Sequence, residues 1–322
     1  MTLSDVVAPV ASTAQAATKR VRRSWPWLRF VVGPAILLVL LWRLGAGPFL
    51  DGIRMVDGWS IAAAVALGAV ITVCCAWRWS VVARRLGVDM PLRSGIPAYY
   101  RSQFLNVTLP GGVVGDVHRA VSHGREAGDV SGGVRAVAWE RTAGQVVQLA
   151  LTVTVLLVLP SPVRSAMPAL AIAVAVGILA MVYFARRAPR REASRWSRTV
   201  TITANDLRHA LFARSAWPII VITSAIIVAG NTATFLLAAR TAQVPASWDA
   251  LIPLALLVML AMALPLSIGG WGPREGAAAW AFGLAGLTTA AGLTTAVVYG
   301  ILIIASTFPG AIVLVVAWWR RA

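Results

Sequence analysis

Three carboxylates of this sequence stand out because each lies beside a long apolar stretch and has an arginine within three residues. The pairs are Asp116 with Arg119, Glu140 with Arg141, and Glu275 with Arg274. Arginine binds phosphate through two parallel hydrogen bonds, and a neighbouring carboxylate can balance or gate such a cation. We therefore predict a polar cavity in which arginines bind an anion. The alternative is a set of structural ion pairs at helix ends.

Glu140 and Arg141 are adjacent in the chain, so they are poor partners for each other, and we expect each to pair with another helix. The sequence has no DxD, HxxxD or multi-histidine cluster. His118, His123 and His209 have no metal-binding spacing. We predict no metal, no cofactor and no enzymatic activity.

Two of the three clusters follow a glycine- and proline-rich break in the apolar pattern. The first break runs from Asn106 through Pro110, Gly111 and Gly112 to Asp116, and the second runs from Pro265 through Gly269 and Gly270 to Glu275. In lipid an unpaired backbone group costs several kcal/mol, so irregular backbone occurs there only inside protein or along a wet cavity. Paired breaks of this kind indicate a transporter's binding site, where helix N-termini can face an anion. The alternative is a pair of ordinary turns at the membrane surface.

The elements that must position these residues are membrane-spanning helices. The chain has 322 residues, of which 58% are hydrophobic and only 13% are charged, whereas soluble domains have about 25% charged residues. Several uncharged stretches reach the roughly 20 residues that a spanning helix needs. Residues 276–319 contain no charge over 44 residues, a length of about 66 Å as a helix, so we expect them to fold back at residues 286–295.

The sequence thus predicts an all-α, polytopic membrane bundle of about eight transmembrane helices with two re-entrant segments, at about residues 96–115 and 265–276. A single membrane domain covers residues 28–319, after a basic tail at residues 1–27. A basic loop at residues 186–214 is expected to be helical and to lie on the surface. The Trp77-Arg78-Trp79 cluster is interpreted as an interfacial aromatic belt in which the cation reaches the headgroups.

The formal charge of +17 comes from 29 basic and 12 acidic residues. The basic residues collect in alternate loops, which is the positive-inside pattern of membrane proteins and not a nucleic-acid surface. It predicts a multi-pass protein of the cytoplasmic membrane with both termini in the cytoplasm and no nucleic-acid partner.

The residues around these clusters resemble the membrane region of lysylphosphatidylglycerol synthases and their stand-alone, flippase-like relatives. The resemblance spans about residues 28–318. The matching pieces are Tyr100-Arg101-Ser-Gln-Phe-Leu-Asn106, Leu109-Pro110-Gly-Gly followed by Gly115-Asp116-Val-His-Arg119, Glu140-Arg141-Thr-Ala-Gly144, and Pro265 followed by Gly269-Gly270-Trp-Gly-Pro-Arg274-Glu275.

This resemblance implies an eight-helix bundle that moves a lipid or lipid-linked substrate between leaflets. The synthases also carry a soluble aminoacyl-transferring domain after the membrane region, whereas this sequence ends at Ala322, so lysyl transfer is not expected. The expected partner is an anionic phospholipid or a polyprenyl-phosphate-linked substrate, and a homo-oligomer stays open. The predicted substrate-binding residues are Arg101, Asn106, Gly111, Gly112, Asp116, Arg119, Glu140, Arg141, Gly269, Gly270, Arg274 and Glu275.

Two alternatives to transport remain open from the sequence. One is a non-transporting accessory or scaffold subunit of an envelope lipid or glycan pathway. The other is a membrane-embedded transferase, which would use Asp116, Glu140 and Glu275 as its carboxylates.

Overall fold

A computed structural model describes residues 32–187, 195–263 and 270–320, and within these residues it contains helices and turns but no strand. The predicted all-α fold class is confirmed. The predicted basic tail, residues 1–27, lies outside the described residues.

The first described helix, Val32–Leu44, bends by 100° into the short α2, Gly47–Met55. The following helix, α3, spans Gly58–Arg85 and begins at a capping box, in which Asp57 accepts a hydrogen bond from the amide of Ser60. Hydrogen bonds from Ser60 hold the pKa of Asp57 below its usual value. A cap of this kind satisfies amides that the first turn of a helix leaves unpaired.

The first glycine-rich break forms the tip of a helical hairpin. Its two arms are α4, Leu92–Thr108, and α5, Val114–Glu126. Gly111 and Gly112 turn the chain with φ of +96° and +64°, a backbone conformation that glycine adopts at no steric cost. The predicted re-entrant segment, residues 96–115, falls within this hairpin, and its depth in a membrane stays a prediction.

The middle of the chain supplies three long helices and a surface element. The predicted basic loop, residues 186–214, is helical over residues 186–187 and 195–211 and ends in a turn. Arg208 connects it to the preceding helix by donating hydrogen bonds to the carbonyls of Ala185 and Arg186. Arg85 of α3 likewise donates to Ser215. The elements are α6 (Val130–Val158), a 3₁₀ turn (Arg164–Ala166), α7 (Met167–Arg187), α8 (Arg195–Asp206), a π turn (Leu207–Leu211) and α9 (Trp217–Thr241).

The C-terminal region contains a second pair of short helices and then a long broken one. The chain folds back after α11 at Gly286, which has a φ of +76°, so the predicted fold-back is confirmed at the start of the expected range. The elements are α10 (Trp248–Met262), α11 (Pro273–Leu284), α12 (Thr289–Thr307) and α13 (Pro309–Trp319).

The described residues contain five helices that are long and apolar enough to cross a membrane, or up to six if the bent pair at Val32–Met55 counts as one. The sequence predicted about eight. The difference arises mainly because α10 and α11 have only 15 and 12 residues, which is about 22 and 18 Å of helix, against a hydrocarbon core of about 30 Å.

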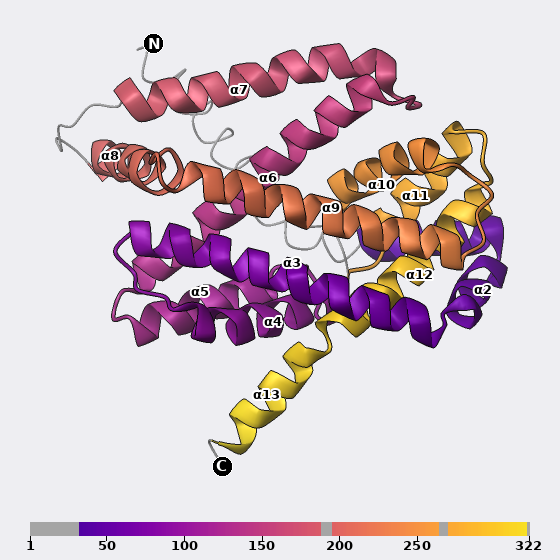
Figure 1. The fold of residues 1–322 in the computed structure, drawn as a ribbon, viewed down its shortest axis with the longest axis horizontal. Helices are drawn as coiled ribbons and strands as arrows, with labels where there is room; N and C mark the ends of the chain where they lie inside the picture. The colour runs from indigo at the N-terminus through magenta and orange to yellow at the C-terminus, as the bar shows by residue number, and fades with distance from the viewer. Residues whose placement is uncertain (1–31, 188–194, 264–269, 321–322) are drawn as a thin grey trace, which may run out of the picture.

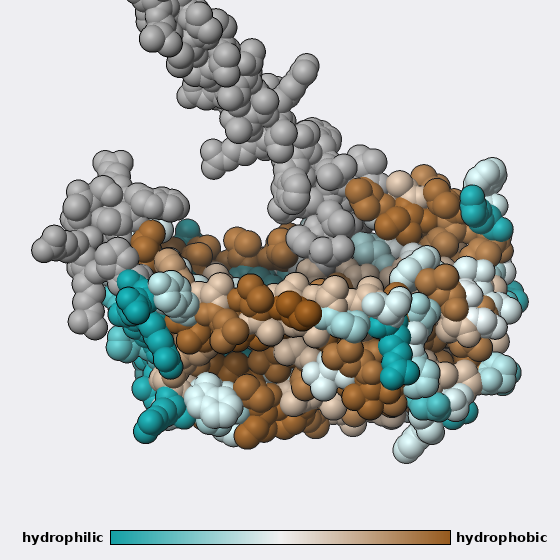
Figure 2. Space-filling model, turned by 90° about the horizontal axis from the view of Figure 1, so that it is seen from above, coloured by the Kyte–Doolittle hydropathy of each residue, from teal (hydrophilic) through white to brown (hydrophobic). Residues whose placement is uncertain are grey.

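The long helices run roughly along one direction, with α3 and α9 side by side at the centre, α7 at one edge and α13 projecting from the bundle (Figure 1). On the face that Figure 2 shows, hydrophobic residues cover most of the middle and hydrophilic residues gather toward the two ends. This distribution is that of a bundle whose sides contact lipid and whose ends contact water.

Candidate functional site

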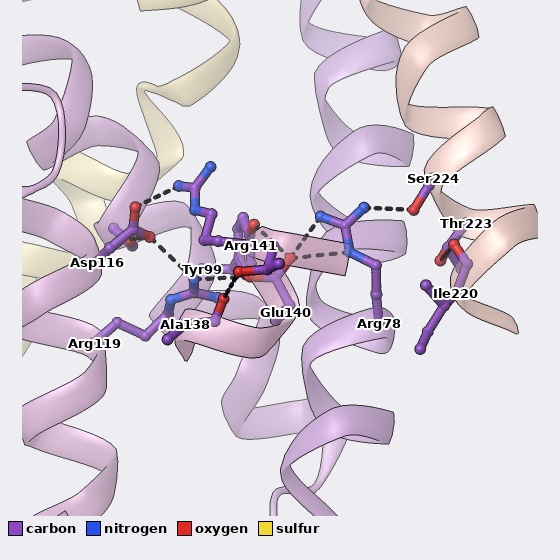
Figure 3. A network of polar contacts seen from close by, with 12 residues as sticks. Arg78, Tyr99, Asp116, Arg119, Ala138, Glu140, Arg141, Ile220, Thr223 and Ser224 are labelled. Carbon is purple, nitrogen blue, oxygen red and sulfur yellow. Dashed lines mark hydrogen bonds and ion pairs between the residues drawn. The ribbon is translucent and has the colours of Figure 1, made fainter. Parts of the chain in front are cut away.

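A network of buried ion pairs joins α3, α5 and α6. Its centre is Glu140 of α6, whose side chain has no exposed surface. One carboxylate oxygen, Oε1, accepts hydrogen bonds from Arg78 at 3.0 and 2.6 Å, and the other, Oε2, accepts one from Arg119 at 3.1 Å. Glu140 therefore lies between two guanidinium groups that come from different helices (Figure 3). As predicted, it does not pair with its neighbour Arg141.

Asp116 of α5 forms the second acidic centre of this network. Its Oδ1 lies 3.0 Å from Arg119, and its Oδ2 lies 2.6 Å from Arg141 of α6. Ser102 and Asn106, both of α4, also donate hydrogen bonds to Asp116, each at 3.1 Å. Asp116 thus attaches both arms of the α4–α5 hairpin to the span α6.

Arg119 occupies a slot between two aromatic rings. Its guanidinium lies 4.4 Å from the centroid of Trp79 and 4.2 Å from that of Tyr99. Its Nε and Nη1 atoms have no hydrogen-bond partner among the described residues. The ring faces therefore stabilise the part of this cation that the carboxylates do not reach.

A cavity of about 300 Å³ lies beside the network, lined by residues of α3, α4, α6, α9 and α12. Arg78 and Arg141 both line it. The side chain of Arg141 is 41% accessible, because it faces this cavity. The remaining polar lining consists of carboxamides and hydroxyls: Thr72, Gln103, Asn106, Gln145, Gln148, Ser224, Asn231, Ser306 and Thr307, with Tyr99 and Tyr299.

The tips of the two glycine-rich breaks meet at this cavity. Gly112 of the first and Gly270 of the second both line it. A Cβ atom added to Gly270 would lie 3.7 Å from the carbonyl oxygen of Val107, at the end of α4. The two segments are separated by more than 150 residues in the chain, yet they bound one space, as their similar sequences suggested.

The helix N-termini that follow the breaks are occupied by the protein's own side chains. The amide of Gly115, at the start of α5, donates to Asn106 at 2.7 Å, and the amide of Gly272, before α11, donates to Glu275 at 2.6 Å. The two breaks in the sequence predict that such amides face an anionic ligand. In the structure, the cationic groups that line the cavity are the side chains of Arg78 and Arg141.

Of the predicted site residues, four line the cavity and three others form the ion-pair network beside it. Arg101 and Arg119 line a second, smaller cavity of about 190 Å³. Gly111 is buried in the hairpin tip and does not line the main cavity, and Gly269 lies outside the described residues. The cavity residues are Asn106, Gly112, Arg141 and Gly270, and the network residues are Asp116, Arg119 and Glu140.

Arg274 and Glu275 form a separate buried pair, and contact of Arg274 with a substrate stays a prediction. The Arg274 guanidinium contacts Glu275 at 2.6 Å and lies over the ring of Trp271. Neither residue lines the main cavity. Arg274 packs against α12 at Gly300, where a Cβ would come within 2.8 Å of the guanidinium carbon.

The chain matches the family model described as Lysylphosphatidylglycerol synthase TM region over residues 27–310, which is most of its length. The chain belongs to this family. A search of curated proteins found no match. Membership in the lysylphosphatidylglycerol synthase membrane-region family, together with the long apolar helices, identifies a multi-pass membrane protein of lipid metabolism or transport.

In this member of the lysylphosphatidylglycerol synthase membrane-region family, sequence reasoning missed Arg78. The sequence suggests a cation at the membrane interface, but Arg78 is only 5% exposed and donates hydrogen bonds to both Glu140 and Ser224. Five apolar or small residues, from Trp79 to Ala83, follow it and are all buried. In the sequence, the run of apolar or small residues that continues past Arg78 to Ala83 is the signal that could have placed Arg78 inside the bundle.

Gly144 of α6 provides the space for the Arg78 guanidinium, and its replacement tests the network. A Cβ at this position would lie 2.8–2.9 Å from the guanidinium atoms. We expect Gly144→Ala to displace Arg78 from Glu140 and to lower the free energy of unfolding by about 1–3 kcal/mol, as overpacking does. Thermal unfolding of the purified protein in detergent measures this.

The matched control is Gly177→Ala in α7, because a Cβ there meets no atom within 4 Å. This variant is expected to unfold at or above the wild-type temperature, since alanine favours helix over glycine. Equal unfolding temperatures for the two variants would show that Arg78 does not depend on the space at Gly144.

Proposed function

We propose that this protein is a flippase-like transporter, which moves an anionic lipid or lipid-linked substrate between the leaflets of the cytoplasmic membrane without changing it chemically. The observation that carries the proposal is a cavity inside an apolar bundle, with the side chains of Arg78 and Arg141 in its wall. A cation at such a depth is costly unless it is paired or serves a ligand. Arg141 retains accessible surface that its contact with Asp116 does not cover.

The two glycine-rich breaks support the same function. Transporters form binding sites inside the membrane from irregular backbone that lines a polar cavity. Here both glycine-rich tips lie at the cavity that holds the arginines. In this proposal the lipid phosphate meets Arg141 while the hydrocarbon chains stay in the surrounding lipid.

The orientation belongs to the proposal too. The ends of α3 and α7 that carry Arg84, Arg85, Arg186 and Arg187 lie at the same end of the bundle (Figure 1). By the positive-inside rule, this end faces the cytoplasm.

The test is transfer of a fluorescent phosphatidylglycerol across the membrane of liposomes that contain the purified protein. Added dithionite bleaches only the outer leaflet of sealed empty liposomes, and it bleaches both leaflets where the lipid changes sides. We expect Arg141→Gln to slow transfer about tenfold or more, because one charge-assisted hydrogen bond contributes about 1.5–3 kcal/mol. Asp116 keeps Arg119, Ser102 and Asn106 as partners, so this variant should still fold.

Arg164→Gln is the matched control, because this arginine is exposed in the turn before α7. It should transfer lipid at the wild-type rate. Transfer no faster than in empty liposomes would reject transport and favour the accessory-subunit alternative. Transfer by Arg141→Gln at the wild-type rate would show that Arg141 does not bind the lipid phosphate during transfer.

A further inference from the structure

The wall of the main cavity carries positive charge and, among the described residues, no carboxylate. Arg78 and Arg141 line it, whereas Asp116 and Glu140 lie behind them in the network and do not. The network as a whole contains three arginines and two carboxylates, so three positive and two negative charges leave one positive charge.

This balance favours a ligand with one negative charge. A single anion next to Arg141 neutralises the network, whereas a second charge on the ligand would have no counterpart there. A headgroup with amino groups would bring further positive charge next to two guanidiniums. Like charges a few ångströms apart repel strongly where the surroundings exclude water.

The uncharged part of the wall fits hydroxyl groups. Carboxamides both donate and accept hydrogen bonds, as alcohol groups do. Thr72 donates to the carboxamide oxygen of Gln103 at 2.8 Å, which leaves the nitrogen of Gln103 as the donor for a ligand. Gln145 lines the cavity from α6. Gln148 and Asn231 also line it, and their nitrogens donate to the carbonyls of Met259 and Ile227, so their carboxamide oxygens are the groups left to accept from a ligand.

The size of the cavity limits what enters it. A volume of about 300 Å³ is at the lower end of the range for small-molecule sites. It accommodates a headgroup and excludes whole hydrocarbon chains.

We propose that the cavity selects a phosphodiester headgroup with a single negative charge and several hydroxyls, and that it rejects aminoacylated, cationic headgroups. This inference rests on the proposed function and names its substrate class. Two kinds of lipid share this chemistry: a glycerophospholipid with a polyol headgroup and a polyprenyl monophosphate that carries one sugar.

Competition in the liposome assay tests the selection. Transfer of the fluorescent phosphatidylglycerol is measured with unlabelled phosphatidylglycerol, polyprenyl monophosphate glucose, phosphatidylcholine or lysylated phosphatidylglycerol as the competitor. We expect one or both of the first two to compete at least tenfold better than the last two. The stronger of the first two identifies the source of the headgroup.

A charge inserted into the wall provides the variant test. Gln145→Glu adds a carboxylate to the cavity and cancels the excess positive charge, so the tenfold preference for the monoanionic lipids should disappear. Gln243→Glu makes the same change at an exposed turn after α9 and should keep the preference.

The outcomes separate the two proposals. Transfer with equal competition by all four lipids, or strongest competition by the lysylated lipid, overturns the selectivity and leaves transport intact. An unchanged preference in Gln145→Glu overturns it as well. No transfer of any lipid overturns the proposed function itself.

Discussion

Glu140→Gln is expected to lower the free energy of unfolding by about 3–5 kcal/mol, the cost of removing one partner from a buried ion pair. Glutamine keeps the shape of the side chain but removes the charge that balances Arg78 and Arg119. The network would then hold three arginines against Asp116 alone. Thermal unfolding in detergent, followed by tryptophan fluorescence, measures the loss.

Glu126→Gln on α5 is the control, because this carboxylate is exposed and its partner Ser122 is also at the surface. Its unfolding temperature should match that of the wild type. A Glu140→Gln variant as stable as this control would mean that the charge of Glu140 does not hold α3 and α5 to α6.

Arg274→Ala is expected to destabilise the protein by a similar amount, about 3–5 kcal/mol, because it leaves the carboxylate of Glu275 buried without its cation. The side chains of both residues are at most 3% exposed. The double variant Arg274→Met/Glu275→Gln should recover most of this loss. It removes both charges, and the glutamine oxygen can still accept the hydrogen bond that the Gly272 amide donates to Glu275.

The double variant also decides what Arg274 does. If the pair is structural, as its position outside the cavity wall indicates, this variant transfers lipid at the wild-type rate. A double variant that is stable but does not transfer lipid would instead indicate that Arg274 contacts the substrate. Arg54→Ala, at an exposed position in α2, controls for loss of an arginine in general and should change neither property.

Local sequence signals were enough for the fold class and for the two breaks. Apolar length predicted α3, α6, α7 and α9, and the glycine pairs predicted where the chain reverses. The number of spans was predicted less accurately, because apolar composition cannot distinguish a helix of 12 residues from one that crosses the bilayer. The α10–α11 pair is the example.

The pairing within the site could not be read from the chain. Arg78 and Glu140 are 62 positions apart, and their contact depends on how α3 packs against α6. Proximity in sequence correctly paired Arg274 with Glu275, but it did not show that neither residue lines the main cavity. It was informative for Asp116 and Arg119, which are one helical turn apart and do form a pair.

In the proposed transport, the contact between Asp116 and Arg141 would couple a bound headgroup to the hairpin α4–α5. A phosphate that binds the Nη2 atom of Arg141 would compete with Asp116, one of the two residues of this hairpin that form ion pairs with α6. Loosening the hairpin therefore strengthens anion binding, and by thermodynamic reciprocity a bound anion loosens the hairpin to the same extent. Under the proposed function, the transported lipid would therefore itself supply the free energy that frees the α4–α5 hairpin to move.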